Sequence, residues 1–253
     1  MTSTDKEGRY NFGSCHDWTG DPEQPGLPYL WSGLSSSTSF GWSYHKWTFC
    51  SSGSLACLER IAGPELPQLT RSGRLAFVTS VEGTGDFSSW PDAEEGLAGL
   101  DAADSVCRNL AASAGLPFEE SFKAWLSDDS MDAIDRFEHD GPWVRIDGVP
   151  IAQNKEDLVS GSLFSSIEVT ELGDYASDSD VFSAWTGSDS SGQAHARNCS
   201  SWTDGTEKGL GLVGVSVGSG HQWTSYFSDY CNVSRSLYCL SDIKPMVFAN
   251  RFE

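Results

Sequence analysis

The feature that most constrains this sequence is an internal repeat, present once in full and once in half. Residues 2–19 align without a gap on residues 186–203, at a constant offset of 184. The matched pairs across the whole repeat include Cys15 and Cys199, Trp18 and Trp202, Trp42 and Trp223, Cys50 and Cys231, and Cys57 and Cys239. Because these features keep the same order in both copies, the chain is expected to carry two related modules.

The repeat also predicts domain boundaries. The part of the second copy that precedes Trp185 has no counterpart before residue 1, so the sequence is expected to begin within a module. We assign residues 1–62 to the C-terminal half of one unit, 63–73 to a Pro-containing linker, 74–243 to a complete unit and 244–253 to a tail. The half-unit buries too little to be stable alone, which makes self-association through it possible. Its first seven residues lack an apolar core, so no signal peptide is expected in this sequence.

The charge balance excludes several partners. The chain has 36 acidic and 16 basic residues, a formal net charge of -20, and its field repels phosphate and sulfate polymers. We therefore expect no binding to nucleic acid or heparin. No run of about 18 apolar residues is present, so direct membrane insertion is not expected either. The 10 tryptophans and 12% aromatic content favour a packed globular core.

Hydrophobic periodicity predicts an α+β domain in the complete unit. Apolar residues at helical spacing predict one helix over 92–114, ended by Gly115. A shorter helix is expected near 131–137. Predicted strands cover 75–80, 122–126, the hairpin 143–146 and 149–152, and segments near 185, 212–217, 223–227 and 237–240.

Seven cysteines are an odd number, which calls for an explanation in an oxidising compartment. If the complete unit pairs its first cysteine with its last and its middle two together, the repeat dictates the remaining bridge. The resulting pairs are Cys107 with Cys239, Cys199 with Cys231, and Cys15 with Cys50. Cys57 is then a free thiol, because the equivalent of Cys107 is missing from the half-unit. Reduced cysteines are the alternative, but the repeated spacing favours disulfides, and close Cys pairs typical of zinc sites are absent.

Six segments of the complete unit form a recognisable series of motifs: the run 96–104 before Cys107, segments 114–117 and 122–127, and the sequences 185–188, 199–202 and 237–239. Together they resemble the endostatin-like domain of bacterial surface proteins, including leptospiral endostatin-like lipoproteins, with collagen endostatin a more distant relative. The resemblance implies a C-type-lectin-like fold with nested disulfides in a secreted or cell-surface protein. It also implies adhesion to host proteins or matrix. Heparin and zinc binding, known for collagen endostatin, are not expected here, given the acidic charge and the lack of an N-terminal histidine cluster.

Metal and cofactor sites find little support in the sequence. The Glu-Pro-Asn and Trp-Asn-Asp motifs of calcium-dependent lectins are absent, and only Asp229 stands close before Cys231. Calcium around Asp174, Asp178 and Asp180 remains open beside the alternative of a solvated acidic loop. The five histidines, which do not fall at metal-ligand spacing, are His16, His45, His139, His195 and His221. We therefore assign no metal-binding and no cofactor-binding residues.

No catalytic residues are assigned, because the sequence has no Gly-x-Ser-x-Gly elbow and no Cys-His constellation. The large tryptophans could stack on sugars, but core packing is favoured because two of them recur in the repeat. These residues are Trp125, Trp143, Trp185, Trp202 and Trp223. We predict a non-enzymatic binding module that recognises protein or glycan through the long loop region 147–220, with its ligand-binding residues unknown. The alternative is a structural unit of a tandem array, fibre or surface assembly.

The repeat makes a prediction about thiols. Peptide mapping of the non-reduced chain by mass spectrometry is expected to recover the Cys15–Cys50 bridge and to find the only alkylatable thiol at Cys57. A bridge from Cys57 to any other cysteine would contradict the half-unit interpretation.

Overall fold

A computed structural model describes residues 29–32, 46–49, 73–176 and 183–243. The chain divides into two units, Met1–Gln68 and Leu69–Glu253. The larger unit combines a mixed β-sheet with helices and short helical turns, so its fold is α+β, as the sequence predicts.

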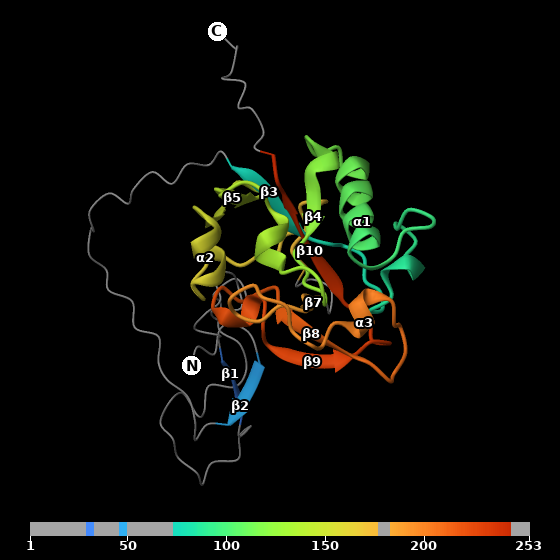
Figure 1. The fold of residues 1–253 in the computed structure, drawn as a ribbon. Coiled ribbons are helices and arrows are strands. Elements are labelled where there is room, and N and C mark those ends of the chain that lie inside the picture. The colour runs from blue at the N-terminus through green and yellow to red at the C-terminus, as the bar shows by residue number, and fades with distance from the viewer. Residues whose placement is uncertain (1–28, 33–45, 50–72, 177–182, 244–253) are drawn as a thin grey trace, which may run out of the picture. The chain divides into compact units, whose positions relative to one another are not determined.

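The sheet of the larger unit is organised around its last strand, β10 (Ser236–Ser241). On it, β3 (Arg74–Val78) and β4 (Phe122–Ala124) pair antiparallel, whereas β7 (Ser183–Trp185) pairs parallel. The strand order is β6-β5-β3-β10-β7-β8-β9, with β4 added on β10 (Figure 1). The outer strands are β5 (Trp143–Arg145), β6 (Pro150–Ala152), β8 (Leu210–Val215) and β9 (Phe227–Tyr230). Among the described strands, β6 and β9 are the two edges of the sheet path.

The long helix is shorter than predicted: α1 spans Gly99–Ser113, and residues 92–98 form turns instead of helix. Gly96 and Gly99 have φ values of +87° and +57°, which a continuous right-handed helix does not allow. A side chain at Gly99 would also crowd the Ser201 carbonyl oxygen, 3.0 Å from the position of its Cβ. The predicted end is correct, because Gly115 (φ +68°) closes a Schellman motif in which the Leu116 N–H donates to the Ala111 carbonyl oxygen.

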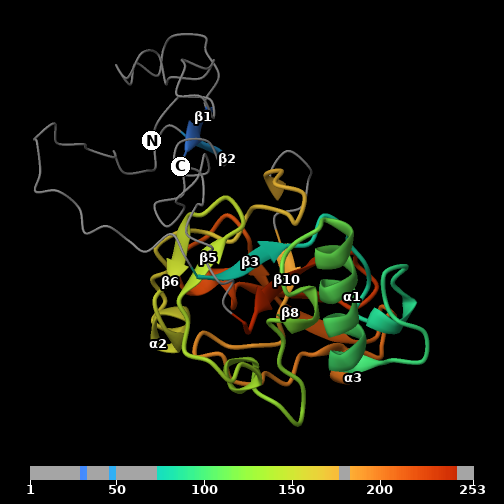
Figure 2. The same ribbon diagram turned by 90° about the horizontal axis from the view of Figure 1, so that it is seen from above.

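Both faces of the sheet are buried. Along the central strands, neighbouring residues alternate between two apolar clusters: Phe77 and Cys239 pack with α1, whereas Val78 and Tyr238 belong to the other cluster. The second cluster includes Leu158 of the short helix α2 (Lys155–Val159), which lies well away from α1 in both views of the unit (Figure 2).

The five tryptophans singled out in the sequence are core residues, each at most 1% exposed. Each indole N–H donates to an oxygen far away in sequence, with nitrogen to oxygen distances of 2.8–3.1 Å. The acceptors are the Thr224 hydroxyl for Trp125 and the carbonyls of Ser241, Gly83, Ser127 and Leu158 for Trp143, Trp185, Trp202 and Trp223. Their burial rules them out as exposed sugar-stacking platforms.

The short helix expected near 131–137 is present as a 3-10 helix, η4 (Ala133–Arg136). One predicted element is wrong in type. The strand expected at 223–227 is replaced by η6 (His221–Trp223) and the later strand β9. Trp223 turns inward here, and its carbonyl oxygen packs so closely on Gly214 that no side chain fits at that position. Further 3-10 turns are η2 (Phe87–Ser89) and η3 (Glu119–Ser121).

The disulfides of the larger unit join Cys107 to Cys239 and Cys199 to Cys231, the two pairs expected for the complete unit. The first connects α1 to the central strand β10. The second connects α3 (Cys199–Trp202) to the residue that follows β9. All four cysteines are buried.

The segment α3 is a left-handed turn. Its four residues have φ values between +51° and +62°, and none of them is glycine. Each such residue costs about 1–2 kcal/mol relative to a right-handed backbone. The disulfide at Cys199, the buried Trp202 and the Asn198 side chain, which accepts from the Ser201 N–H, oppose this cost.

The smaller unit contributes one described strand pair, β1 (Tyr29–Ser32) with β2 (Lys46–Phe49). Its register repeats that of β8 and β9: Tyr29 pairs with Phe49 as Leu210 pairs with Tyr230, each 181 positions later. The offset of 181 also relates Cys50 to Cys231. This agreement in backbone pairing is independent of the residue identities that indicated the repeat.

The left-handed turn predicts a stabilising substitution. Ser200 has φ +56° and is exposed, so Ser200→Gly is expected to raise the free energy of unfolding by about 0.5–1 kcal/mol. Chemical denaturation measures this change. Ser200→Ala, which removes the hydroxyl but keeps Cβ, is the control and should give no gain; equal effects of the two variants would contradict the strain argument.

Candidate functional site

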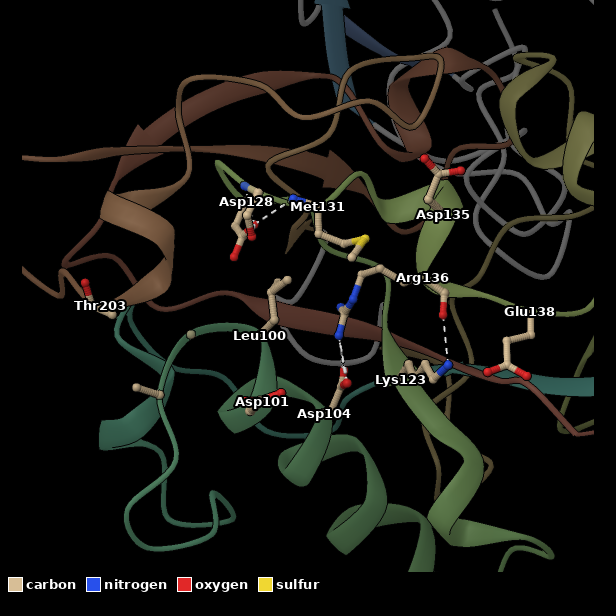
Figure 3. A pocket seen from close by; sticks show the side chains of 13 residues that line it. Leu100, Asp101, Asp104, Lys123, Asp128, Met131, Asp135, Arg136, Glu138 and Thr203 are labelled. Atoms are coloured by element: carbon tan, nitrogen blue, oxygen red, sulfur yellow. Dashed lines mark hydrogen bonds and ion pairs between the residues drawn. The ribbon is translucent and has the colours of Figure 1, made fainter.

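A pocket of about 620 Å³ opens between the N-terminal turn of α1, strand β4 and residues 128–138 (Figure 3). Leu100 and the partly exposed Met131 supply its apolar wall. Carboxylates are numerous around it: Asp101, Asp104, Asp128, Asp135 and Glu138. The pocket was not predicted from the sequence, since its walls come from four separate segments, the fourth represented by Thr203.

The centre of the pocket is a buried ion pair between Arg136 and Asp104. The Arg136 Nη2 lies 2.7 Å from both carboxylate oxygens, and its Nη1 donates to the Ala124 carbonyl oxygen at 2.6 Å. Asp104 also accepts from the Ala124 N–H. Burial raises the pKa of the Asp104 carboxyl, an effect that the attraction of Arg136 offsets only in part. This pair fastens α1 to β4.

The second cation at the pocket, Lys123, is also held internally. Its Nζ donates to the Arg136 carbonyl oxygen at 2.8 Å and to Asp242 Oδ2 at 3.1 Å. Asp101, Asp135 and Glu138, in contrast, are exposed carboxylates. The pocket therefore has an acidic rim around a neutralised centre, and it offers acceptors to cations and hydrogen-bond donors.

A second surface feature is the aromatic edge, which we define as Leu210 of β8, Phe227 and Tyr230 of β9, and Tyr226, which directly precedes β9. Their exposed fractions are 37%, 60%, 37% and 56%. Tyr230 lies opposite Leu210 in the strand register, and the rings of Tyr226 and Phe227 pack edge to face at 5.4 Å. The edge is thus a set of large apolar side chains in solvent at the end of the sheet path.

The long loop region is anchored to the sheet through Arg145 of β5. Arg145 pairs with Asp147 at 2.6 Å and with the fully buried Glu168 at 3.1 Å, and it lies 5.6 Å from the centre of the Tyr175 ring. Burial alone would raise the pKa of Asp147, but the hydrogen bond and charge of Arg145 hold it below its ordinary value. Glu171 accepts from the Ser80 N–H at 3.0 Å and adds a second anchor.

Several sequence-predicted positions lie outside the described residues: Cys15, Cys50, Cys57, His16, His45, Asp178 and Asp180. Of the three carboxylates considered for calcium, Asp174 alone lies within the described residues, and its side chain is exposed. His195 and His221 stand apart in sequence from His139, which the fold brings to Asp242, 103 residues away. Glu138, His139 and Asp242 form a group whose side chains lie close enough to hold a metal ion, and their spacing in the sequence could not reveal it.

The comparison with family models finds no match, nor does the search of curated proteins. Within the described part of the chain, no helix is long and apolar enough to cross a bilayer. Buried disulfides of this kind are typical of proteins that fold in an oxidising compartment.

The Arg136 pair predicts a large effect on stability. Arg136→Ala leaves the buried Asp104 carboxylate without its cationic partner and is expected to lower the free energy of unfolding by about 3–5 kcal/mol. Without Arg136, the pKa of Asp104 rises further, so the variant should lose stability as pH increases from about 4 to about 7 relative to the unmodified protein. Denaturant titrations at both pH values measure this.

The control is Arg108→Ala, in α1, the helix that also carries Asp104. Arg108 lies 3.9 Å from Glu120, whose side chain is 87% exposed, and it attracts Asp104 less strongly than Arg136 does, so its loss should cost less than about 1 kcal/mol. Similar losses for the two arginines would show that the Arg136 pair is not a buried interaction.

Proposed function

We propose that this chain is a non-enzymatic binding module of the C-type-lectin-like, endostatin-like kind, in a secreted or cell-surface protein, and that it binds a protein ligand. The observation that carries the proposal is the aromatic edge of β8 and β9. Tyr and Phe are enriched in the buried centres of protein interfaces, where a few side chains supply most of the binding free energy. Exposed groups of this kind mark interaction surfaces.

The position of the edge supports the same proposal. Strands β8 and β9 lie at the C-terminal boundary of the long loop region, through which we predicted ligand recognition from the sequence. The disulfide to Cys231 fixes the end of β9, and Arg197 donates to the Ser228 hydroxyl at 2.8 Å. A surface held in this way loses little conformational freedom when a ligand binds.

The fold assignment rests on three features that a C-type-lectin-like domain combines. The first is the nested pair of disulfides, and the second is the pairing of the first and last strands of the larger unit, β3 and β10, in the middle of the sheet. The third is the long, loop-rich region between β6 and β8. A structural unit of a tandem array is the alternative function, and the exposed edge strand β9 would serve self-association equally.

A binding screen tests the proposal. The full chain is applied to arrays of matrix proteins and glycans at physiological salt, and any ligand is titrated against Tyr226→Ala and Tyr230→Ala. Each variant is expected to lose about 2 kcal/mol of binding free energy at unchanged melting temperature. Ile243→Ala, at a side chain that is 45% exposed outside both the aromatic edge and the long loop region, is the control and should bind normally.

Three outcomes speak against a protein-binding role at this edge. The first is a ligand that binds the Tyr226→Ala and Tyr230→Ala variants as tightly as the unmodified protein, and the second is binding to glycans alone. The third is concentration-dependent assembly of the chain by itself, measured by sedimentation velocity. The last would favour the array function.

A further inference from the structure

We propose that Glu138, His139 and Asp242 form a binding site for a zinc-type divalent cation. One nitrogen or oxygen atom from each side chain lies within 4.8 Å of the others. Glu138 and His139 follow the turn η4, and Asp242 directly follows the central strand β10. Glu138 and the neighbouring Lys123 also line the acidic pocket (Figure 3).

The spacing of two ligand atoms already fits a metal. His139 Nδ1 lies 3.2 Å from Asp242 Oδ1. Two ligands bound to a tetrahedral zinc ion at about 2.0–2.1 Å are about 3.3 Å apart. A metal ion can therefore replace the hydrogen in this contact with little change in the distance between the two ligand atoms. The metal-bound imidazole would then carry its proton on Nε2.

Asp242 is held in place independently of any metal. Its main-chain N–H donates to the Ser121 carbonyl oxygen, and its own carbonyl oxygen accepts from Arg74 Nε at 3.0 Å. The carboxylate accepts from the N–H groups of Glu138 and His139 at 3.0 and 3.1 Å. The side chain is only 8% exposed, so a ligand oxygen is fixed at the surface without freedom to rotate away.

Two cations near Asp242 oppose a metal ion here, Lys123 and Arg74. The Lys123 ammonium lies 3.1 Å from Asp242 Oδ2, which leaves Oδ1, on the His139 side, as the ligand atom. Glu138 is exposed, so its side chain can rotate to complete a set of three ligands and leave a fourth position for water.

The ligand set selects the class of metal. One imidazole nitrogen with two carboxylate oxygens suits Zn²⁺ and Co²⁺, whereas Ca²⁺ and Mg²⁺ require oxygen ligands in larger number. The site is separate from the calcium alternative at Asp174 and differs from the cysteine-rich zinc sites that the sequence excludes.

The test is calorimetric titration of the full, oxidised chain with Zn²⁺, with Cys57 alkylated so that its expected thiol does not compete. His139→Asn keeps a donor toward Asp242 but cannot bind as imidazole, and it should weaken Zn²⁺ binding by about tenfold or more. Glu138→Gln, at an exposed side chain, should also weaken it. Lys123→Met should tighten it by about tenfold, because one of the opposing charges is removed.

His195→Asn is the matched control and should leave the affinity unchanged. The Co²⁺ form provides a second readout, since tetrahedral coordination gives intense visible absorption that His139→Asn should abolish. Equal Zn²⁺ affinity in the unmodified protein and in the His139 and Glu138 variants would overturn the proposal. So would Lys123→Met without a gain, or Ca²⁺ binding as tightly as Zn²⁺.

Discussion

The buried tryptophans set the constraint on which this fold depends. An indole ring contributes a large apolar surface, but its N–H must find an acceptor once water is excluded. In this protein the five indoles meet that requirement with acceptors in other segments, among them the Ser127 and Leu158 carbonyls. The irregular segments are thereby fixed to the sheet, which allows a domain rich in loops to have a continuous core.

The sequence predicted the elements whose signals are local. Gly115 marked the end of α1, and short runs of mostly apolar residues marked β3 and β10. The start of α1 was missed because Asp92–Ala98 suits a helix in composition, whereas Gly99 is required by a contact with Ser201 about a hundred residues later. The strand predicted at 223–227 failed for the same reason, since Trp223 is drawn inward by its contacts with Gly214 and Leu158.

The candidate sites were less accessible to sequence reasoning. Neither the Arg136–Asp104 pair nor the approach of His139 to Asp242 has a spacing that could be recognised, because each joins segments brought together only by the sheet. The aromatic residues before Cys231 were visible, but their exposure was not, since Trp223 is buried while Tyr226 is open to solvent. The cysteine pairs of the larger unit, in contrast, are the nested pairs that were expected from the sequence.

The left-handed turn at 199–202 restricts how this segment can change over evolution. Backbone in that region is adopted most readily by Gly, Asn, Asp and His, whereas β-branched side chains are strongly disfavoured. The first copy of the repeat aligns His16 and Asp17 with Ser200 and Ser201, so its substitutions fall within the tolerated types. Related sequences should therefore carry Ser, Gly, Asn, Asp or His at the two positions between the cysteine and the tryptophan. A Val, Ile or Thr at either position would indicate a module in which this segment has a different backbone conformation.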